Sequence, residues 1–181
     1  GKALSRKELA VAETLLDRGA DANFRGDNAS QLSVVAEAEN DNPKCVPLLL
    51  HWGARVDVWS MEQGCNKYPA AKGVKDVISV LMDHLHDKGD INRLIEDRET
   101  ALHIAIRCGR KDLVERLIQE LEANVNIRDH YGDYPVHVAL RQSEAMAYIK
   151  LLQRSPTFDK SVENSEERTC FRQAKFKGQY S

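Results

Sequence analysis

Two histidines lie in segments whose residue types could do chemistry. The stretch "TALHIAIRCG" (residues 100–109) contains His103 and Cys108, and "YPVHVALRQS" (134–143) places His137 at the equivalent position 34 residues later. An imidazole can serve as a general base or a metal ligand, and a thiol can serve as a nucleophile. His103 and Cys108 are five positions apart on one short predicted helix, so their side chains do not face each other.

A structural role explains both histidines better, because a reactive group is rarely duplicated at a fixed spacing. Thr100 carries a hydroxyl of the kind that caps the start of a helix, and Tyr134 stands in its place in the second segment. A buried or half-buried His103 would need a hydrogen-bond partner within its turn or from the next unit. We therefore predict structural roles for Thr100, His103 and His137.

Other patterns that would indicate catalysis, a metal or a cofactor are missing from the sequence. It contains no G-x-S-x-G, no H-E-x-x-H and no phosphate-binding glycine loop. His84 and His86 would point apart on a helix. The cysteines are widely separated, at Cys45, Cys65, Cys108 and Cys170. We predict a protein that is not an enzyme and that uses no metal or cofactor.

The composition is that of an ordinary globular chain. It has 181 residues, 42% of them hydrophobic and 30% charged, with a net charge of −2. The near-neutral charge argues against nucleic-acid binding, and no apolar run is long enough for membrane insertion. The sparse cysteines and the lack of a secretory signal favour an intracellular location, cytoplasmic or nuclear. The sequence leaves the oligomeric state open.

A short phrase recurs along the chain at a nearly constant interval. The phrase "GADANF" (19–24) and its relatives each end on an Asn or Asp, at Asn23, Asp57, Asn92, Asn126 and Asp159. The intervals are 34, 35, 34 and 33 residues. Most copies follow an apolar pair at helical position, and a second amphipathic segment precedes that pair. Each unit is therefore predicted to be helix, turn, helix and extended loop, with short helices that must stack to bury their apolar faces.

These units resemble the ankyrin repeat family, whose repeats open on T-P-L-H-x-A and close on G-A-D-x-N. The clearest copies run from Glu99 to Asp129 and from Gly132 to Asp159. The resemblance implies an all-α fold, an ankyrin-repeat α-solenoid of helix-turn-helix units joined by extended hairpin-like loops. It implies about five repeats in a single array over residues 1–181, which begins and ends inside a repeat. The approximate units are 1–25 (second half only), 26–59, 60–94 (irregular), 95–128, 129–160 and 161–181 (first half only).

The third unit departs most from the family pattern. Its T-P-L-H opening is missing, Pro69 falls where the first helix is expected, and an extra loop is predicted near residues 60–66. Alternatively, Tyr68 and Pro69 could start that helix. The irregularity fits either drift within an internal repeat or a specialised surface for a partner. In the second unit, Pro47 suits the first turn of a helix.

The resemblance also implies that a partner protein or peptide binds to the concave face, which loop tips and first helices form. The positions that carry over are Arg25, Trp59, Met61, Glu62, Glu96, Arg107, Cys108, Arg128, His130, Tyr131, Asp133, Arg141 and Gln142. Trp59 and Tyr131 are of the residue types that dominate binding hot spots. Trp59 could instead pack onto Tyr68 or the irregular loop.

Three arginines could form a positive strip in this groove. Arg107, Arg128 and Arg141 belong to neighbouring units, whereas Glu96, Asp97 and Asp133 lie close enough in the sequence pattern to neutralise them; the sequence therefore indicates no preferred charge for the partner. The leading functional hypothesis is a non-catalytic protein-interaction module within a larger scaffold, adaptor or regulatory protein. Two alternatives remain: a nucleotide-like sensor using Trp59, Lys67 and Tyr68, and an intramolecular structural or autoinhibitory spacer.

Overall fold

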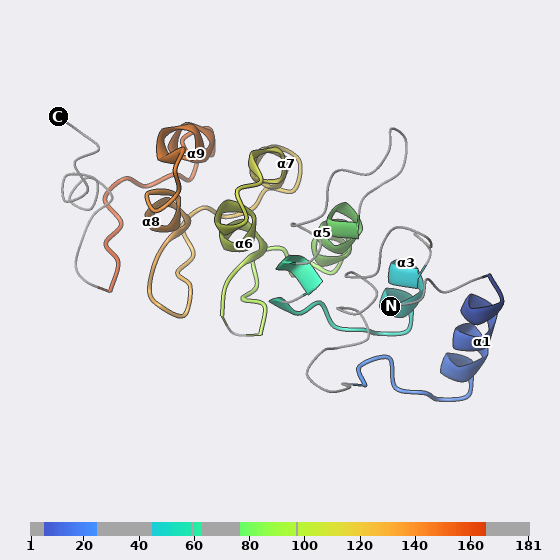
Figure 1. Cartoon of the computed structure of the whole chain (residues 1–181). Helices are drawn as coiled ribbons and strands as arrows, with labels where there is room; N and C mark the ends of the chain where they lie inside the picture. Colours follow the sequence, from blue (N-terminus) through green and yellow to red (C-terminus); the bar gives the residue numbers. More distant parts are fainter. Residues whose placement is uncertain (1–5, 25–44, 59, 63–76, 97, 166–181) are drawn as a thin grey trace. The chain divides into compact units, whose positions relative to one another are not determined.

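The computed structural model describes residues 6–24, 45–58, 60–62, 77–96 and 98–165, with side chains from residue 10 onward. The chain divides into two compact units, residues 1–87 and residues 88–181. The helices whose residues are all described are α1 (Arg6–Asp17), α3 (Cys45–His51), α5 (Val77–Asp87), α6 (Ala101–Arg107), α7 (Lys111–Gln119), α8 (Pro135–Ala139) and α9 (Ala145–Leu152), shown in Figure 1.

In the first unit, α1 and α3 share a small apolar core, and α3 also packs against α5. Leu16 of α1 and Ala54 after α3 are buried together, with Leu48 and Leu49 packed against them. Pro47 is the third residue of α3. It lies in the first turn as predicted, where its missing N–H would have no partner within the helix.

The predicted loop near residues 60–66 is wrong for its first three residues, because residues 60–62 are helical. The backbone N–H of Ser60 donates to the carboxylate of Asp57 at 2.6 Å, and the hydroxyl of Ser60 accepts from the Asp57 N–H at 3.1 Å. This reciprocal cap starts a helix at the place where the copies that end on Asn92 and Asn126 are followed by hairpins. Met61 is consequently fully buried rather than exposed at a loop tip, and Glu62 is half-buried. Trp59 and Arg25 lie outside the described residues.

The second unit contains two helix pairs that stack side by side. Helix α6 packs against α7 and α8, and α9 packs against α7 and α8. Figure 1 shows α6 and α8 in one row and α7 and α9 in another, with the loops before α6 and α8 projecting to the same side. Every residue of α6 from Ala101 to Ile106 is buried, which leaves Arg107 as its exposed end. The first helices therefore form the interior of the stack.

The three asparagines that help set the repeat interval, Asn23, Asn92 and Asn126, bond to the following repeat. In the first unit, the amide of Asn23 donates to the carbonyl of Gly53 at 3.0 Å and accepts from the N–H of Arg55 at 2.8 Å. In the second unit, the side chain of Asn92 accepts from the N–H of Asn124 at 2.7 Å. Asn126 does the same with its own successor, bonding Thr157 and Asp159. The spacing found in the sequence thus marks a chain of bonds between neighbours.

Candidate functional site

Two hairpins in the second unit, residues 95–99 and 129–133, carry four of the predicted contact positions: Glu96, His130, Tyr131 and Asp133. Each closes with an equivalent backbone bond: the Ile95 N–H donates to the Glu99 carbonyl at 2.9 Å, and the Asp129 N–H donates to the Asp133 carbonyl at 2.8 Å. The hairpins also bond to each other, because the His130 N–H donates to the Arg98 carbonyl at 2.7 Å. We call these two hairpins, together with the C-terminal ends of α6 and α8, the hairpin face.

Histidine 103 connects the start of α6 to the next hairpin. Its Nδ1 lies 2.8 Å from the Thr100 hydroxyl and 3.3 Å from the Thr100 N–H, and its Nε2 lies 3.2 Å from the Asp133 carbonyl. An Nδ1 that accepts leaves the proton on Nε2, which then donates to Asp133. Burial lowers the pKa of His103, while the charges of Asp129 and Asp133 and the bond to the Asp133 carbonyl oppose that shift.

His137 occupies the equivalent place at the start of α8, where Tyr134 is the N-cap residue. It is fully buried, and its Nδ1 accepts from the Tyr134 N–H at 3.3 Å. The Tyr134 hydroxyl accepts a bond from Nε of Arg128 at 3.0 Å, and the Arg128 guanidinium lies 5.1 Å from the centre of the tyrosine ring. Tyrosine thus keeps the backbone half of the cap and directs its hydroxyl to a neighbouring arginine.

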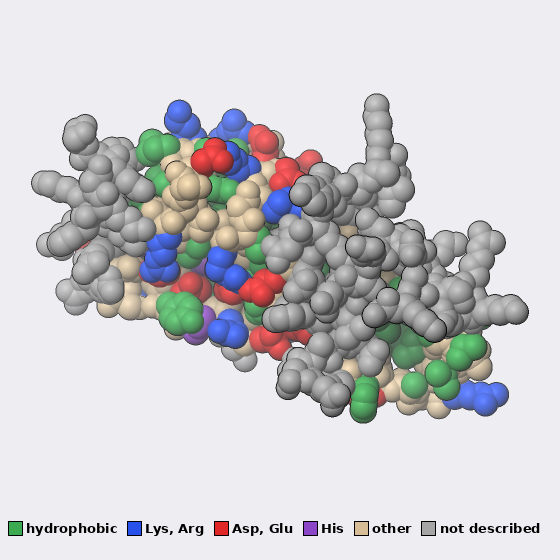
Figure 2. Space-filling model, in the orientation of Figure 1, with side chains coloured by type: hydrophobic (Ala, Val, Ile, Leu, Met, Phe, Trp, Pro, Cys, Tyr) green, Lys and Arg blue, Asp and Glu red, His purple; other side chains and the backbone are tan. Residues whose placement is uncertain are grey.

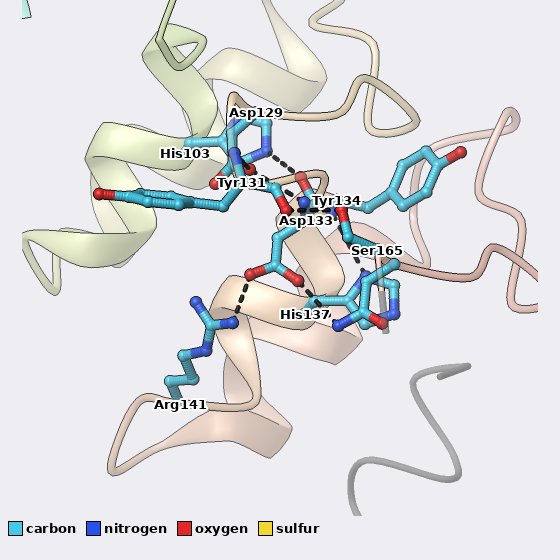
Figure 3. Close-up of polar contacts among 9 residues, drawn as sticks. His103, Asp129, Tyr131, Asp133, Tyr134, His137, Arg141 and Ser165 are labelled. Carbon is cyan, nitrogen blue, oxygen red and sulfur yellow. Dashed lines mark hydrogen bonds and ion pairs between the residues drawn. The ribbon is translucent and has the colours of Figure 1, made fainter. Parts of the chain in front are cut away.

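Asp133 is buried, which corrects its predicted place among exposed partner contacts. Its carboxylate accepts from the amide of Asn164 at 2.9 Å and from the guanidinium of Arg141, while its carbonyl accepts from His103. Figure 3 shows the carboxylate between Arg141 and the chain that carries Ser165. A carboxylate at this depth is stable because both oxygens have partners. Asp133 is therefore a link between repeats.

The same ion pair occurs in both repeats, between an acid just before the helix cap and an arginine eight positions later. Arg107 binds Glu99 through Nη2 at 2.7 Å and Nε at 3.3 Å, and Arg141 binds Asp133. The acids are covered and the arginines are not: side-chain exposure is 42% for Arg107 against 13% for Glu99, and 47% for Arg141 against 4% for Asp133. Sequence reasoning anticipated the neutralising role of Asp133 but missed Glu99.

Tyr131 is the most exposed large hydrophobic residue that the structure describes, with 65% of its surface accessible. Its ring lies 3.6 Å from that of His130, centre to centre. The backbone beneath it is fixed, because the Tyr131 N–H donates to the Asp129 carboxylate at 2.8 Å and its carbonyl accepts from Ser165 at 2.7 Å. A large aromatic side chain thus stands in solvent on a rigid turn.

The remaining predicted contacts occupy the edges of the hairpin face. Glu96 is exposed in the first hairpin, and Arg128 and His130 are exposed in or beside the second. Cys108 follows α6 as its C-cap and is half-buried, as is Gln142 after α8. Figure 2 shows basic and acidic side chains next to one another just below the position of α6 and α8.

Two further observations concern the described residues only. None of their helices combines the length and apolar character needed to cross a membrane. Their His, Cys, Asp and Glu side chains form no cluster of three that could hold a metal ion.

The family model for "Ankyrin repeats (3 copies)" matches residues 68–171, which is more than half of the sequence. The chain belongs to the ankyrin repeat family. Ankyrin repeats are a general protein–protein interaction module, and domains built from them are generally non-catalytic. The hairpins are the loops between successive repeats, and α6–α7 and α8–α9 are the helix pairs of two repeats.

Among known proteins, the chain is 28% identical over 155 residues to ankyrin repeat protein FPV244 of fowlpox virus (strain NVSL), covering 83% of this chain and 22% of that protein. It is 33% identical over 86 residues to human neurogenic locus notch homolog protein 1, covering 47% of this chain and 3% of that protein. The chain therefore spans about a fifth or less of the length of these relatives.

Two solved structures share the fold. The ankyrin repeat domain of human ASB11 has a TM-score of 0.60 and 24% identity, covering 92% of this chain and 72% of that one. The ankyrin repeat domain of Bcl-3, described as a member of the IkappaB protein family, has a TM-score of 0.64 and 20% identity, covering 91% and 72%. An all-α ankyrin solenoid is thus the fold of this chain.

Proposed function

We propose that this chain is a non-catalytic interaction module of a larger intracellular protein, and that it binds a partner protein or peptide on the hairpin face. The observation that carries the proposal is Tyr131, an exposed aromatic ring on a turn whose backbone is held by Asp129 and Ser165. Tyrosine buries a large area on binding while losing little side-chain freedom, and a rigid turn lowers the entropy lost on association.

The setting of Tyr131 supports the same proposal. Arginine and tyrosine are the residue types that concentrate binding energy in interfaces, and Arg107 and Arg141 belong to the same hairpin face. Arg128 is already positioned over the ring of Tyr134, which reduces the number of conformations it would lose when a partner covers it. The sensor hypothesis depends on Trp59, Lys67 and Tyr68, which lie outside the described residues.

Photo-crosslinking tests the proposal at single positions. A benzophenone amino acid would be placed at Tyr131 in one variant and at Met146, which is exposed on α9, in a matched control. We expect discrete protein adducts from position 131. An excess of unlabelled wild-type chain should suppress these adducts by competition, whereas an excess of the Tyr131→Ala chain should not. Equal adducts from both positions, or none from position 131, would contradict binding on the hairpin face.

A further inference from the structure

We propose that the partner presents an extended acidic segment, which lies across the ends of α6 and α8 and receives hydrogen bonds from Arg107 and Arg141. This inference rests on the proposed function and adds the chemistry of the partner. The sequence alone indicates no preferred charge, because acids and arginines occur in similar numbers around the groove. The exposure of the acidic and basic side chains decides which charge a partner meets at this surface.

The two ion pairs are oriented alike, with the negative member inside. The exposed fraction of the side chain is 13% for Glu99 and 42% for Arg107. The difference is larger in the second pair, with 4% for Asp133 and 47% for Arg141. A partner that approaches this surface meets guanidinium groups first. Each of these less exposed carboxylates holds its arginine in place, so less side-chain freedom is lost when a second anion binds.

A guanidinium in such a pair can still bind another carboxylate. Arginine presents several N–H donors in a planar fork, and the bond from Arg141 to Asp133 uses Nη2. A second carboxylate on the outer edge of the fork would form charge-assisted hydrogen bonds, which are stronger than neutral ones. The pairing acid offsets part of the positive charge, so recognition depends on geometry as well as on charge.

The distance between the first helices of neighbouring repeats sets the spacing of the acidic residues in the partner. Arg107 ends α6 and Arg141 follows α8 closely, and these two helices pack together. Packed helices lie about 8–10 Å apart. An extended chain of the polyproline type rises about 3.1 Å per residue and returns to the same side every third residue, or after about 9 Å. Acidic residues at every third position therefore match neighbouring arginines.

The second-helix side of the same unit shows why this arrangement is specific to the hairpin face. Arg154 pairs with Glu115 there, and the two side chains are exposed almost equally, at 53% and 47%. That pair presents both signs to solvent, whereas the pairs at Arg107 and Arg141 present one. The exposed Glu96 lies in the hairpin tip, beyond the Ile95–Glu99 bridge from α6, so it leaves the helix end itself basic.

Fluorescence anisotropy with defined peptides tests the inference on the whole chain. The probe is a labelled synthetic peptide with Glu at every third position, and the matched control carries Gln at the same positions. We expect salt-sensitive binding of the Glu peptide that exceeds binding of the Gln peptide by at least about tenfold. Arg107→Gln and Arg141→Gln should each lower the affinity by roughly three- to tenfold, and Arg154→Gln should leave it unchanged.

Several outcomes would overturn the inference. They are equal binding of the Glu and Gln peptides, an equal loss with Arg154→Gln, and tighter, arginine-dependent binding of single-stranded DNA than of the peptide. Because Arg141→Gln removes a partner of buried Asp133, its thermal unfolding is measured too, and the peptide comparison on wild-type chain does not depend on any variant. Adducts at position 131 without acidic-peptide binding would leave the proposed function standing and reject only the acidic partner.

Discussion

The two repeats that begin with the hairpins at residues 95–99 and 129–133 are built on the same plan, yet their hairpins depend on different interactions. Both place a histidine at the third helical position and an acid–arginine pair across the first helix. The carboxylate of Glu99 accepts from Arg107 in its own repeat, whereas that of Asp133 accepts from Arg141 and from Asn164 beyond its own repeat. The ion pair is thus a repeated element, whereas the bond from the paired acid to the following repeat is found, among the described residues, at Asp133.

The backbones of the two repeats differ as well. The non-glycine residues with positive φ among those described are Glu96 and Glu122, both at 51° and both in the earlier repeat. In the later repeat the positive φ of the hairpin falls on Gly132, at 81°. The earlier hairpin therefore has its positive φ on a non-glycine residue, its second, whereas the later hairpin has it on a glycine, its fourth.

Replacing His103 by alanine should have the largest effect on stability. The change opens a cavity and removes the bonds to Thr100 and Asp133, so we expect the free energy of unfolding to fall by about 3 kcal/mol. Urea denaturation measures it, with exposed His130→Ala as the control, expected near zero. A loss below that of His130→Ala would show that His103 does not hold the repeats together.

Removing the two acids should distinguish the two ion pairs. Asp133→Ala deprives Asn164 and Arg141 of their acceptor in a buried setting and should cost about 2 kcal/mol. Glu99→Ala breaks a pair whose arginine stays solvated and should cost about 0.5–1 kcal/mol. Equal losses in thermal or urea unfolding would mean that the bond to Asn164 contributes nothing.

Gly132→Ala should destabilise the later hairpin by about 1–2 kcal/mol, because φ is positive there. A Cβ at this position would also overlap the hydroxyl of Ser165, which bonds the Tyr131 carbonyl. Arg98 is the equivalent residue of the earlier hairpin, and Arg98→Ala should change stability by less than about 0.5 kcal/mol. Differential scanning calorimetry of both variants measures the two changes in stability. A larger loss of stability for Arg98→Ala than for Gly132→Ala would contradict the prediction.

Acid should weaken the fold through His103. Burial lowers the pKa of His103 in the folded chain below its ordinary value, so the folded state takes up its proton at lower pH than the unfolded state. Stability from this residue is complete above about pH 6.5 and falls, by up to about 1.4 kcal/mol per pH unit, as the pH drops toward the folded pKa. Urea titrations across this range should show a steeper decline for wild type than for His103→Asn.

Glu122→Gly should stabilise the earlier repeat, by about 1 kcal/mol. Gly19, Gly53 and Gly89 precede the closing residues of other copies, with φ between 73° and 90°, and Glu122 has that role before Asn126. Glycine relieves the strain of the left-handed conformation. Glu120→Gly is the control, since Glu120, the C-cap of α7, has a negative φ of −106° and glycine there should destabilise. Lower stability for Glu122→Gly would contradict the strain.

Much of the fold could be predicted from residues that must repeat. Asn23, Asn92 and Asn126 have to recur at a fixed interval because each bonds the next repeat, so the interval and the helix pairs were visible in the sequence. The buried setting of His103 also followed from its twin at His137. Met61 could not be placed, because Asp57 and Ser60 cap a helix where the pattern suggested a loop.

The candidate site was less predictable because it depends on depth. Asp133 looked like an exposed tip residue, and only the folded contact with Asn164 shows why it is buried. The role of Glu99 was not predicted, because its partner Arg107 lies at the far end of α6. Patterns of neighbouring residues in the sequence do not indicate a contact over that separation. The acid and the arginine are eight residues apart in both pairs, Glu99–Arg107 and Asp133–Arg141, and this shared spacing is the signal that could have identified them.

The bonds of Asp133 limit how the number of repeats can change in the coding sequence. Loss of residues 100–133 would preserve the phase of the helices, because the segment is one full repeat long, and would leave Glu99 directly before Tyr134. Glu99, with a longer side chain than Asp133, would then have to accept hydrogen bonds from both Arg141 and Asn164. The deletion would also remove His103, which bonds the Asp133 carbonyl. Recombination that is neutral for the helices would therefore be selected against at the junction.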